Sequence, residues 1–139
     1  GIDLDFSDIA IDNLIIENSK NDCIDMSFGN YEILNARILN CGDKGVSVGE
    51  KSTVNLNDIN IDNVDIGVAS KDSSKVYIEN SIIDANICFA AYRKKQEFSG
   101  SILKYNNTNC QNDKFVSQVG SLIIKKWVLE LKKKYLLRT

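Results

Sequence analysis

The feature that most constrains this chain is a tandem repeat of 22 residues. Shifting the sequence by this interval brings five positions into register: Gly1, Cys23, Gly45, Gly67 and Phe89. An apolar-x-apolar phrase follows most of them, and a second phrase, apolar-x-Asn/Asp-x-x-Ile, recurs later in the units. A repeat of about 20 to 30 residues predicts a solenoid, in which each unit buries its apolar face only by stacking on the next.

The spacing of apolar residues indicates the kind of solenoid. Val and Ile recur at every second position in short runs, which is the alternation of β-strands. One unit holds three such runs, Val46–Val48, Val54–Leu56 and Ile59–Ile61. They predict a triangular coil, whose successive turns pair in parallel about 4.8 Å apart. The expected inward side chains are Val46, Val48, Val54, Leu56, Ile59 and Ile61 in this coil, and Ile2, Leu4, Ile9, Ile11, Leu14 and Ile16 in the first.

A polar residue recurs at the bend between the second and third strands of each coil. The positions are Asn13, Asn35, Asp58 and Asn80. Asn and Asp tolerate tight bends and bond readily to nearby backbone groups. Stacked coils would place these side chains above one another, so the sequence predicts an asparagine ladder that satisfies backbone groups at the bend.

This pattern resembles the right-handed parallel β-helix repeat proteins, the architecture of the pectate lyases. The resemblance implies an all-β fold of five to six three-stranded coils in a single domain, residues 1–139, with the coils over 1–122. After Phe98 the repeat decays. Apolar residues from Ile124 to Tyr135 then follow helical spacing, which predicts a short amphipathic helix over 123–139. We expect it to cap the last coil; a basic membrane-surface helix is the alternative.

Four segments, 21–29, 40–52, 66–74 and 91–98, are also similar to the β-helix segment of bacterial surface proteins related to the CotH spore-coat kinase family. This resemblance implies an extracellular or cell-envelope location, and none of that family's kinase residues has a counterpart here. The first coil starts in full register, so nothing in this sequence covers its strand edges. The chain is therefore expected to be the carboxy-terminal part of a longer protein, or to stack on a partner.

Pectate-lyase-like enzymes commonly carry their chemistry on the outer face of the first strand, which makes the outward residues of that strand the candidate site. In the later coils these are basic, Lys71 and Arg93. We expect both to bind ligand, with the outward Tyr77 as an aromatic surface for a sugar. A solvated charged face is the alternative interpretation.

Acidic residues occupy the same outward positions in the first two coils: Asp3, Asp5 and Asp25. Carboxylates on adjacent coils can share a calcium ion, and a basic residue nearby can abstract a proton from a uronate. The alternative site is therefore calcium at these carboxylates, with Lys71 and Arg93 as catalytic residues. The leading expectation is no cofactor and no catalytic residue.

Composition excludes several classes of function. The chain has 17 Lys and Arg against 19 Asp and Glu, and a net charge of −2 argues against a nucleic-acid-binding protein. It has no His, which excludes His-based catalysis and His metal ligands. It also has no run of about 18 apolar residues, so no membrane span is expected.

The four cysteines, Cys23, Cys41, Cys88 and Cys110, occupy different repeat positions and form no Cys-x-x-Cys pair. A zinc site is therefore not expected. We expect small apolar fillers of the coil. Disulfides are the alternative, because the number is even and the fold is common outside the cell.

Together these features predict a non-catalytic structural or carbohydrate-binding β-helix module of a larger bacterial surface protein. The short length, the regular turns and the lack of a compact catalytic constellation favour it. A polysaccharide lyase, or another carbohydrate-active enzyme acting on an acidic polysaccharide, is the first alternative. A solenoid that self-assembles end to end through its uncapped first coil is the second. The expected partners are a polysaccharide, the rest of a longer chain, and a second copy.

Overall fold

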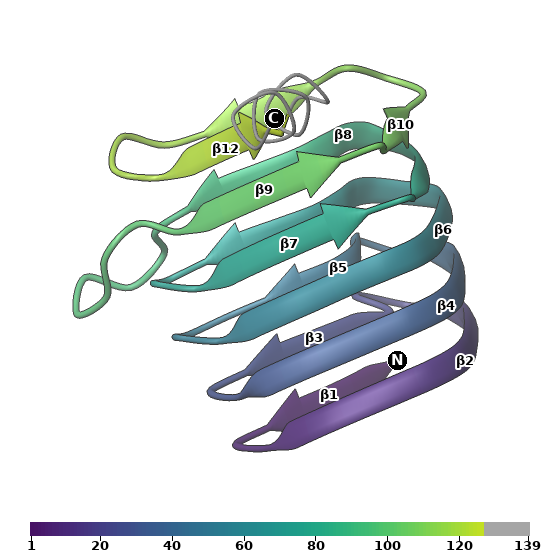
Figure 1. The fold of residues 1–139 in the computed structure, drawn as a ribbon, viewed down its shortest axis with the longest axis horizontal. Coiled ribbons are helices and arrows are strands. Elements are labelled where there is room, and N and C mark those ends of the chain that lie inside the picture. Colours follow the sequence, from purple (N-terminus) through teal and green to yellow (C-terminus); the bar gives the residue numbers. More distant parts are fainter. Residues whose placement is uncertain (127–139) are drawn as a thin grey trace, which may run out of the picture.

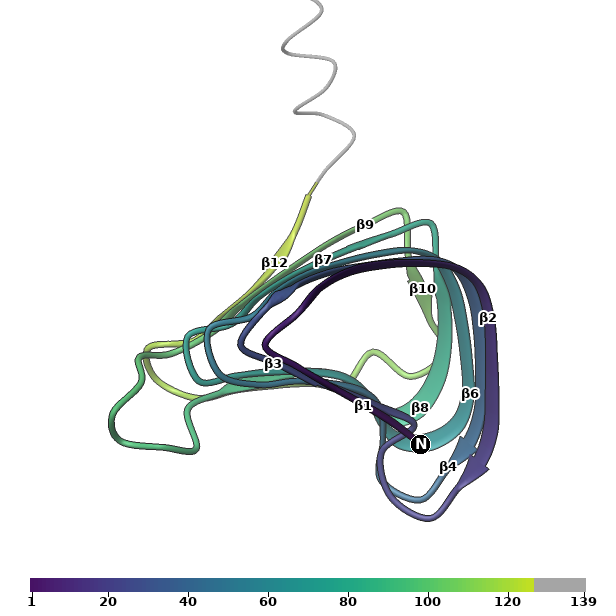
Figure 2. The ribbon, with the colours of Figure 1, turned by 90° about the horizontal axis from the view of Figure 1, so that it is seen from below.

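The chain forms a parallel β-solenoid of about six turns. The computed structural model describes residues 1–126. The coils stack from the amino terminus upward (Figure 1), and the view along the stack has a roughly triangular outline (Figure 2). Twelve strands join in one continuous parallel sheet within this range. They are β1 (Ile2–Asp5), β2 (Asp8–Ser19), β3 (Ile24–Ser27), β4 (Asn30–Cys41), β5 (Lys44–Val48), β6 (Thr53–Lys71), β7 (Lys75–Glu79), β8 (Ile82–Tyr92), β9 (Ile102–Asn106), β10 (Asn109–Cys110), β11 (Phe115–Ser117) and β12 (Leu122–Lys125).

The sheet wraps into three faces. The first sheet contains β1, β3, β5, the end of β6, the end of β8, and β11. The second sheet contains the first halves of β2, β4 and β6, followed by β7, β9 and β12. The third sheet contains the second halves of β2 and β4, the middle of β6, the start of β8, and β10. The predicted three-stranded coil is therefore confirmed.

The expected inward side chains form the core. In the third coil Val46, Val48 and Val54 are fully buried, and Leu56, Ile59 and Ile61 are at most 2% exposed. The first coil has a neighbour on one side only, and its inward residues, such as Leu4 and Ile9, are partly buried against the same core. Most of the stabilisation comes from this continuous column of Val, Ile and Leu, because each buried side chain of this size contributes about 1.5 to 3 kcal/mol.

The repeat shortens by one residue in the fourth coil, and the sequence alignment misses this. A bulge lies between Asp62 and Val64, and Val68 then pairs with Phe89, 21 residues later. The expected alignment of Gly67 with Phe89 is therefore wrong. Because side chains alternate between faces, a shift of one residue exchanges inward and outward positions. The outward partner of Lys71 in the next coil is Tyr92, and Arg93 follows the strand.

The predicted bend residues occupy the corner between the second and third sheets. Asn13, Asn35, Asp58 and Asn80 all adopt left-handed backbone conformations, with φ of 61°, 58°, 59° and 53°. Asn and Asp enter this region at the least cost among non-glycine residues. The expected bonding is wrong, however. Asn35 Nδ2 donates to the carboxylate of Asp12, and Asn80 Nδ2 donates to the side chain of Asn57, so these amides bond to side chains of the preceding coil.

A second asparagine ladder follows the third sheet. Asn18, Asn40 and Asn63 have φ of 62°, 57° and 56°. Asn40 Nδ2 donates to Asn18 Oδ1 at 3.2 Å, and Asn63 Nδ2 donates to Asn40 Oδ1 at 2.8 Å. Here each amide bonds directly to the equivalent amide below, so these three residues form a continuous ladder that the sequence did not predict.

The cysteines form two disulfides, Cys23–Cys41 and Cys88–Cys110, so the apolar-filler interpretation is wrong and its alternative holds. The packing around Gly67 indicates why the Cys88–Cys110 disulfide lies where it does. A Cβ at Gly67 would lie 2.6 Å from Ile83 Cγ2, so the chain is closely packed there. In the next coil Cys88 lies beside Gly67, and Cys110 pairs with Ile83. The Cys88–Cys110 disulfide therefore joins the first and third sheets at the place where, one coil below, Gly67 packs closely against Ile83.

The carboxy-terminal part differs from the expected helix over 123–139. Leu122–Lys125 is a strand, β12, which pairs with β9 in the second sheet. This pairing continues the solenoid to residue 125. Ile123, in the middle of β12, packs against the core as an inward residue. The remainder of the expected cap, 127–139, lies outside the described residues.

Candidate functional site

The outer face of the first sheet has a floor of small residues. Ser47, Ala69 and Ala90 pair in consecutive coils and are at most 2% exposed, although alternation directs them away from the core. Longer side chains surround this floor. They are Asp25, Lys44, Lys71 and Tyr92, all half-buried. We call these residues together the first-sheet face.

Asp25 pairs with Ser47 and lies at the lower end of the first-sheet face. Burial raises the pKa of its carboxyl group, and the attraction of Lys71 opposes that rise. The carboxylates of Asp22 and Asp3 add to the rise. The ionised carboxylate of Asp25 is therefore less stable in the folded protein than in water.

Lys71 has the opposite shift from the same cause. Burial lowers the pKa of its amine, the attraction of Asp25 opposes the change, and the nearby Lys44 adds to it. Within residues 1–126 Lys71 makes no direct ion pair and its amine donates no hydrogen bond. A half-buried cation without a direct partner is therefore the central feature of this face.

Two neighbours complete the charge pattern. Lys44 Nζ lies 2.8 Å from Asp43 Oδ2 and 3.9 Å from Asp22 Oδ1. Burial acts to lower the pKa of Lys44, but its hydrogen bond to Asp43 and other attractions raise it overall. Burial also raises the pKa of the Tyr92 hydroxyl, against the attraction of Lys44. Tyr92 is therefore a protonated donor at neutral pH.

The loop of residues 93–101 borders this face at the corner toward the second sheet, where it drops toward the lower coils (Figure 1). Asp72, only 2% exposed, anchors it by accepting bonds from the backbone N–H groups of Lys94 and Lys95, at 2.6 and 2.8 Å. Lys95 Nζ also pairs with Glu50 Oε1 at 2.8 Å. These contacts fix the loop as a side wall.

An aromatic row lies on the same corner. The Phe6 and Phe28 rings stack with centroids 4.7 Å apart and planes 6° apart, and Phe98 from the loop meets Phe28 edge-on at 6.1 Å. Lys51 Nζ lies 5.9 Å from the centroid of Phe98. Phe6 is 75% exposed, and Phe6 and Phe28 have φ of 49° and 48°, unusual for bulky residues. Such strain at a stacked pair with one exposed and one half-buried ring motivates a functional hypothesis.

The structure separates the three residues expected to bind ligand. Lys71 lies on the first-sheet face, whereas Tyr77 lies on the outside of the second sheet, with Lys126 Nζ 5.9 Å from its ring centroid. Arg93 is exposed at the start of the loop, and its backbone N–H donates to Gln118 Oε1. The three residues therefore do not form one site.

The carboxylates of the alternative calcium site line up on adjacent coils, since Asp3 pairs with Asp25 and Asp5 with Ser27. Ser27 Oγ donates to Asp5 Oδ1. No group of three or more His, Cys, Asp or Glu side chains in residues 1–126 is placed to hold a metal ion. The calcium alternative therefore has no assembled site in this part of the chain.

Sequence reasoning missed Lys44 and Tyr92, and the causes differ. Tyr92 was hidden by the one-residue shift at Val64, which moved Arg93 into the expected outward position. Lys44 precedes the strand expected over Val46–Val48, whereas in the structure it is the first residue of β5. The signal that could have found both is the run of small outward residues, because a floor of Ser and Ala allows long neighbours to fold over it.

The opposing pKa shifts give a first prediction. Lys71→Gln is expected to raise the pKa of Asp25 further, because it removes the attraction that lowers it. Because the pKa of Asp25 is raised in the folded protein, the folded protein binds more protons than the unfolded chain at pH values just above the ordinary Asp pKa. The free energy of unfolding therefore falls as the pH rises through this range. An NMR titration of the Asp25 carboxyl carbon checks the shift. An unchanged or lower pKa in Lys71→Gln would contradict the arrangement.

Among residues 1–126 no helix is long and apolar enough to cross a membrane. Comparison of the whole chain with family models, with curated proteins and with solved structures finds no match. The fold and the first-sheet face are therefore the observations from which function is argued.

Proposed function

We propose that this chain is a carbohydrate-binding module of a larger bacterial surface protein, a right-handed β-helix of the pectate-lyase-like kind, and that its first-sheet face binds an acidic polysaccharide. One observation supports it above the others. Lys71 is a half-buried cation with no direct ion-pair partner among residues 1–126, on a floor of small residues. A uronate carboxylate would supply the missing partner and raise the lowered pKa of Lys71.

The surroundings suit a sugar acid. The hydroxyl of Tyr92 can donate to a sugar oxygen, and the carboxylate of Asp25 can accept from sugar hydroxyls. The exposed ring of Phe6 and the ring of Phe28 offer apolar surface at the neighbouring corner, where a sugar ring can pack. A ligand along the first sheet would therefore meet charge on the face and aromatic surface at its edge.

The disulfides support a location outside the cytoplasm. Disulfides persist in oxidising compartments and are rare in the cytosol. Cys23 and Cys41 are at most 6% exposed and belong to the core, so this bond is part of the packed structure. An extracellular or envelope location follows as part of the proposal.

Lys71→Gln is expected to weaken binding of polygalacturonate or alginate by about tenfold to a hundredfold, since a charge-assisted hydrogen bond contributes about 1.5 to 3 kcal/mol. Lys75→Gln is the matched control, because Lys75 is an exposed lysine on the second sheet. Binding should also weaken with added salt. Titration calorimetry measures the affinity of each variant and its dependence on salt. Repeating it with and without calcium shows whether binding depends on that ion. Equal affinities of the two variants would remove the first-sheet face from the proposal.

A polysaccharide lyase is the second candidate, favoured by the lowered pKa of Lys71. A neutral amine can take the proton α to a uronate carboxylate; the C4–C5 double bond then forms, the bond to the leaving sugar oxygen breaks, and Tyr92 returns a proton to that oxygen. The same variant decides this candidate. Ultraviolet absorbance of unsaturated uronate that is lost in Lys71→Gln supports cleavage, and its absence with wild-type protein leaves a binding module.

A further inference from the structure

The corner between the second and third sheets carries a column of amides that the first-sheet face does not involve. Asn13, Asn35, Asp58, Asn80 and Asn107 follow one another up the coils, all with positive φ. Their left-handed conformation turns the strand through the corner and leaves the polar side chains on the outside, where all but Asn35 are exposed. We call this column, with the outward residues beside it on the third sheet, the amide corner.

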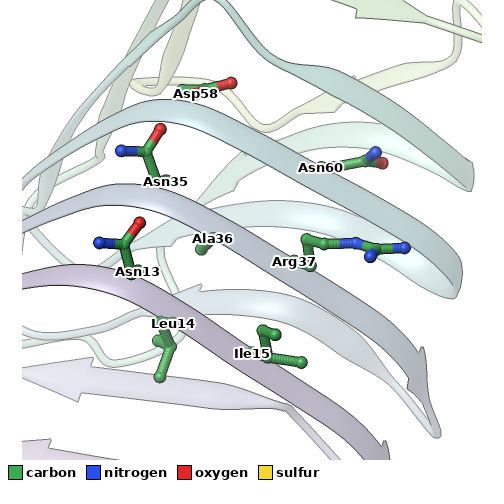
Figure 3. Close-up of a pocket in the computed structure, with 8 residues that line it drawn as sticks. All are labelled: Asn13, Leu14, Ile15, Asn35, Ala36, Arg37, Asp58 and Asn60. Carbon is green, nitrogen blue, oxygen red and sulfur yellow. The ribbon is translucent and has the colours of Figure 1, made fainter.

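A hollow of about 350 Å³ lies at the lower part of the amide corner. Figure 3 shows Asn13 and Asn35 pointing the same way from neighbouring strands, with Arg37 and Asn60 extending from the third sheet beside them. Within residues 1–126 the side chains of Asn13, Arg37, Asp58 and Asn60 make no hydrogen bond or ion pair. This contrasts with Asn18, Asn40 and Asn63, whose amides are used to bond the coils together.

An aliphatic side chain flanks these polar groups. Ile15 lines the hollow and is 67% exposed. Ile15, Arg37, Asn60 and Ile82 pair in sequence up the third sheet, so they form one outward row. Ile82, at the upper end of this row, is 51% exposed. These two isoleucines leave apolar area in water at the two ends of the row, which a bound ligand can cover.

A second hollow of about 530 Å³ lies higher on the same corner, around Ile82. Asn80, Asn107 and Asn109 line it, and Asn107 Nδ2 donates to Asn80 Oδ1 at 2.7 Å. Both hollows therefore have amides beside an exposed isoleucine, and the upper one is also lined by Ser81, Thr108 and Lys125. Ile15 and Ile82 are three coils apart, which corresponds to about 14 Å at the spacing of parallel strands.

We propose that the amide corner binds a neutral, extended glycan that runs parallel to the solenoid axis. Sugar hydroxyls both donate and accept hydrogen bonds, and the corner offers both: amides, one guanidinium and one carboxylate. Arg37 and Asp58 balance in charge, so the lower hollow does not select an anion. Ile15 and Ile82 each offer an apolar surface to the face of a sugar ring. The coil spacing of about 4.8 Å is close to the rise of one sugar in an extended β-linked chain, so successive sugars can meet successive coils.

The geometry disfavours an extended peptide as the occupant. Peptides that add to sheets do so by pairing with the free backbone of an edge strand. At the lower hollow, however, β4 has partners on both sides, β2 and β6. Only side chains are available there, which suits a ligand whose own polar groups surround it on all sides.

The test is calorimetric titration of the whole chain with neutral β-linked oligosaccharides of increasing length. Affinity is expected to rise with length until the ligand spans both hollows, and then to level off. The double variant Arg37→Ala with Ile82→Ala is expected to weaken binding of the longest ligand by about tenfold or more, because it removes one contact from each hollow. Asn55→Ala, an exposed asparagine on the second sheet, is the matched control.

A second readout locates the ligand. In NMR spectra the side-chain amide signals of Asn13, Asn35 and Asn60 should move with the neutral ligand, and Lys71→Gln should leave this binding unchanged. Absence of binding by every neutral oligosaccharide, or equal losses in the double variant and in Asn55→Ala, would overturn the inference. Loss of neutral-oligosaccharide binding in Lys71→Gln would also overturn the inference, because Lys71 lies on the first-sheet face. Acidic glycans test that face by itself, so the two proposals can fail separately.

Discussion

Removing the two disulfides is expected to lower the free energy of unfolding by about 3 kcal/mol for each bond. The separations of 18 and 22 residues, for Cys23–Cys41 and Cys88–Cys110, give this value in the chain-entropy description of a crosslinked unfolded state. Together the losses approach the whole stability of many domains. Denaturant unfolding of the oxidised protein, of each double Cys→Ala variant, and of the protein lacking both bonds measures them.

The two bonds make separate predictions, because they lie in different coils. Cys23–Cys41 closes the second coil, near its start and end, whereas Cys88–Cys110 joins the first and third sheets in the fifth. Their effects should add, since distant sites without shared partners are usually independent. Treatment of the wild-type protein with a reductant gives the control without substitution. A reduced protein as stable as the oxidised one would contradict the structural role assigned to the bonds.

Leu56→Ala is expected to destabilise the protein by about 3 kcal/mol, within the usual range for a buried leucine. Leu56 is 1% exposed in the third coil, with coils above and below it, so the surrounding sheets cannot close the cavity easily. Thermal or denaturant unfolding measures the loss. In a solenoid stability is roughly a sum over coils and their interfaces, so damage to a central coil weakens two interfaces at once.

Two matched variants give this prediction its control. Leu4→Ala changes the same residue type in the first coil, where Leu4 is only partly buried, and should cost about 1 kcal/mol. Asn55→Ala changes the exposed neighbour on the same strand and should stay within about 0.5 kcal/mol. Equal losses at Leu4 and Leu56 would mean that burial along the column does not set stability.

The core was predictable because two periods agree. The alternation of Val and Ile identifies which side chains point inward, and the 22-residue repeat identifies which coils they share. Val46, Leu56 and Ile61 occupy their expected positions for both reasons. The bend residues were predictable for a different reason: Asn and Asp are the non-glycine residues that most readily adopt positive φ.

The register beyond Val64 and the pairing of the cysteines were not predictable in the same way. The bulge between Asp62 and Val64 shortens the repeat by one residue without changing the composition of the sequence. The alternation of apolar residues therefore still identifies strands, but an alignment of coils by 22 residues is wrong by one position. The cysteines occupy unequal repeat positions because each bond joins different points of a coil, and the repeat compares only equivalent points. Both features depend on distances across the coil.

The candidate sites were the least predictable part. Lys71 was singled out as an outward residue, but its lack of a direct ion-pair partner within residues 1–126 and its floor of Ser47 and Ala69 required the structure. The amide corner was interpreted as a structural ladder, and its amides are polar enough for that role. Which amides bond to one another and which do not, as at Asn40 and Asn13, depends on side-chain orientation.

The one-coil offset of every strand pair also governs how the chain can fold. Paired residues lie between 20 positions apart, as for Ile102 and Leu122, and 27 positions apart, as for Lys75 and Ile102. Among residues 1–126 no pair joins distant parts of the chain, so each new coil closes a loop of about the same length as the last, and the entropy of closure stays nearly constant. Folding can therefore start at any pair of adjacent coils and extend in both directions, and the search for partners does not lengthen with the size of the stack.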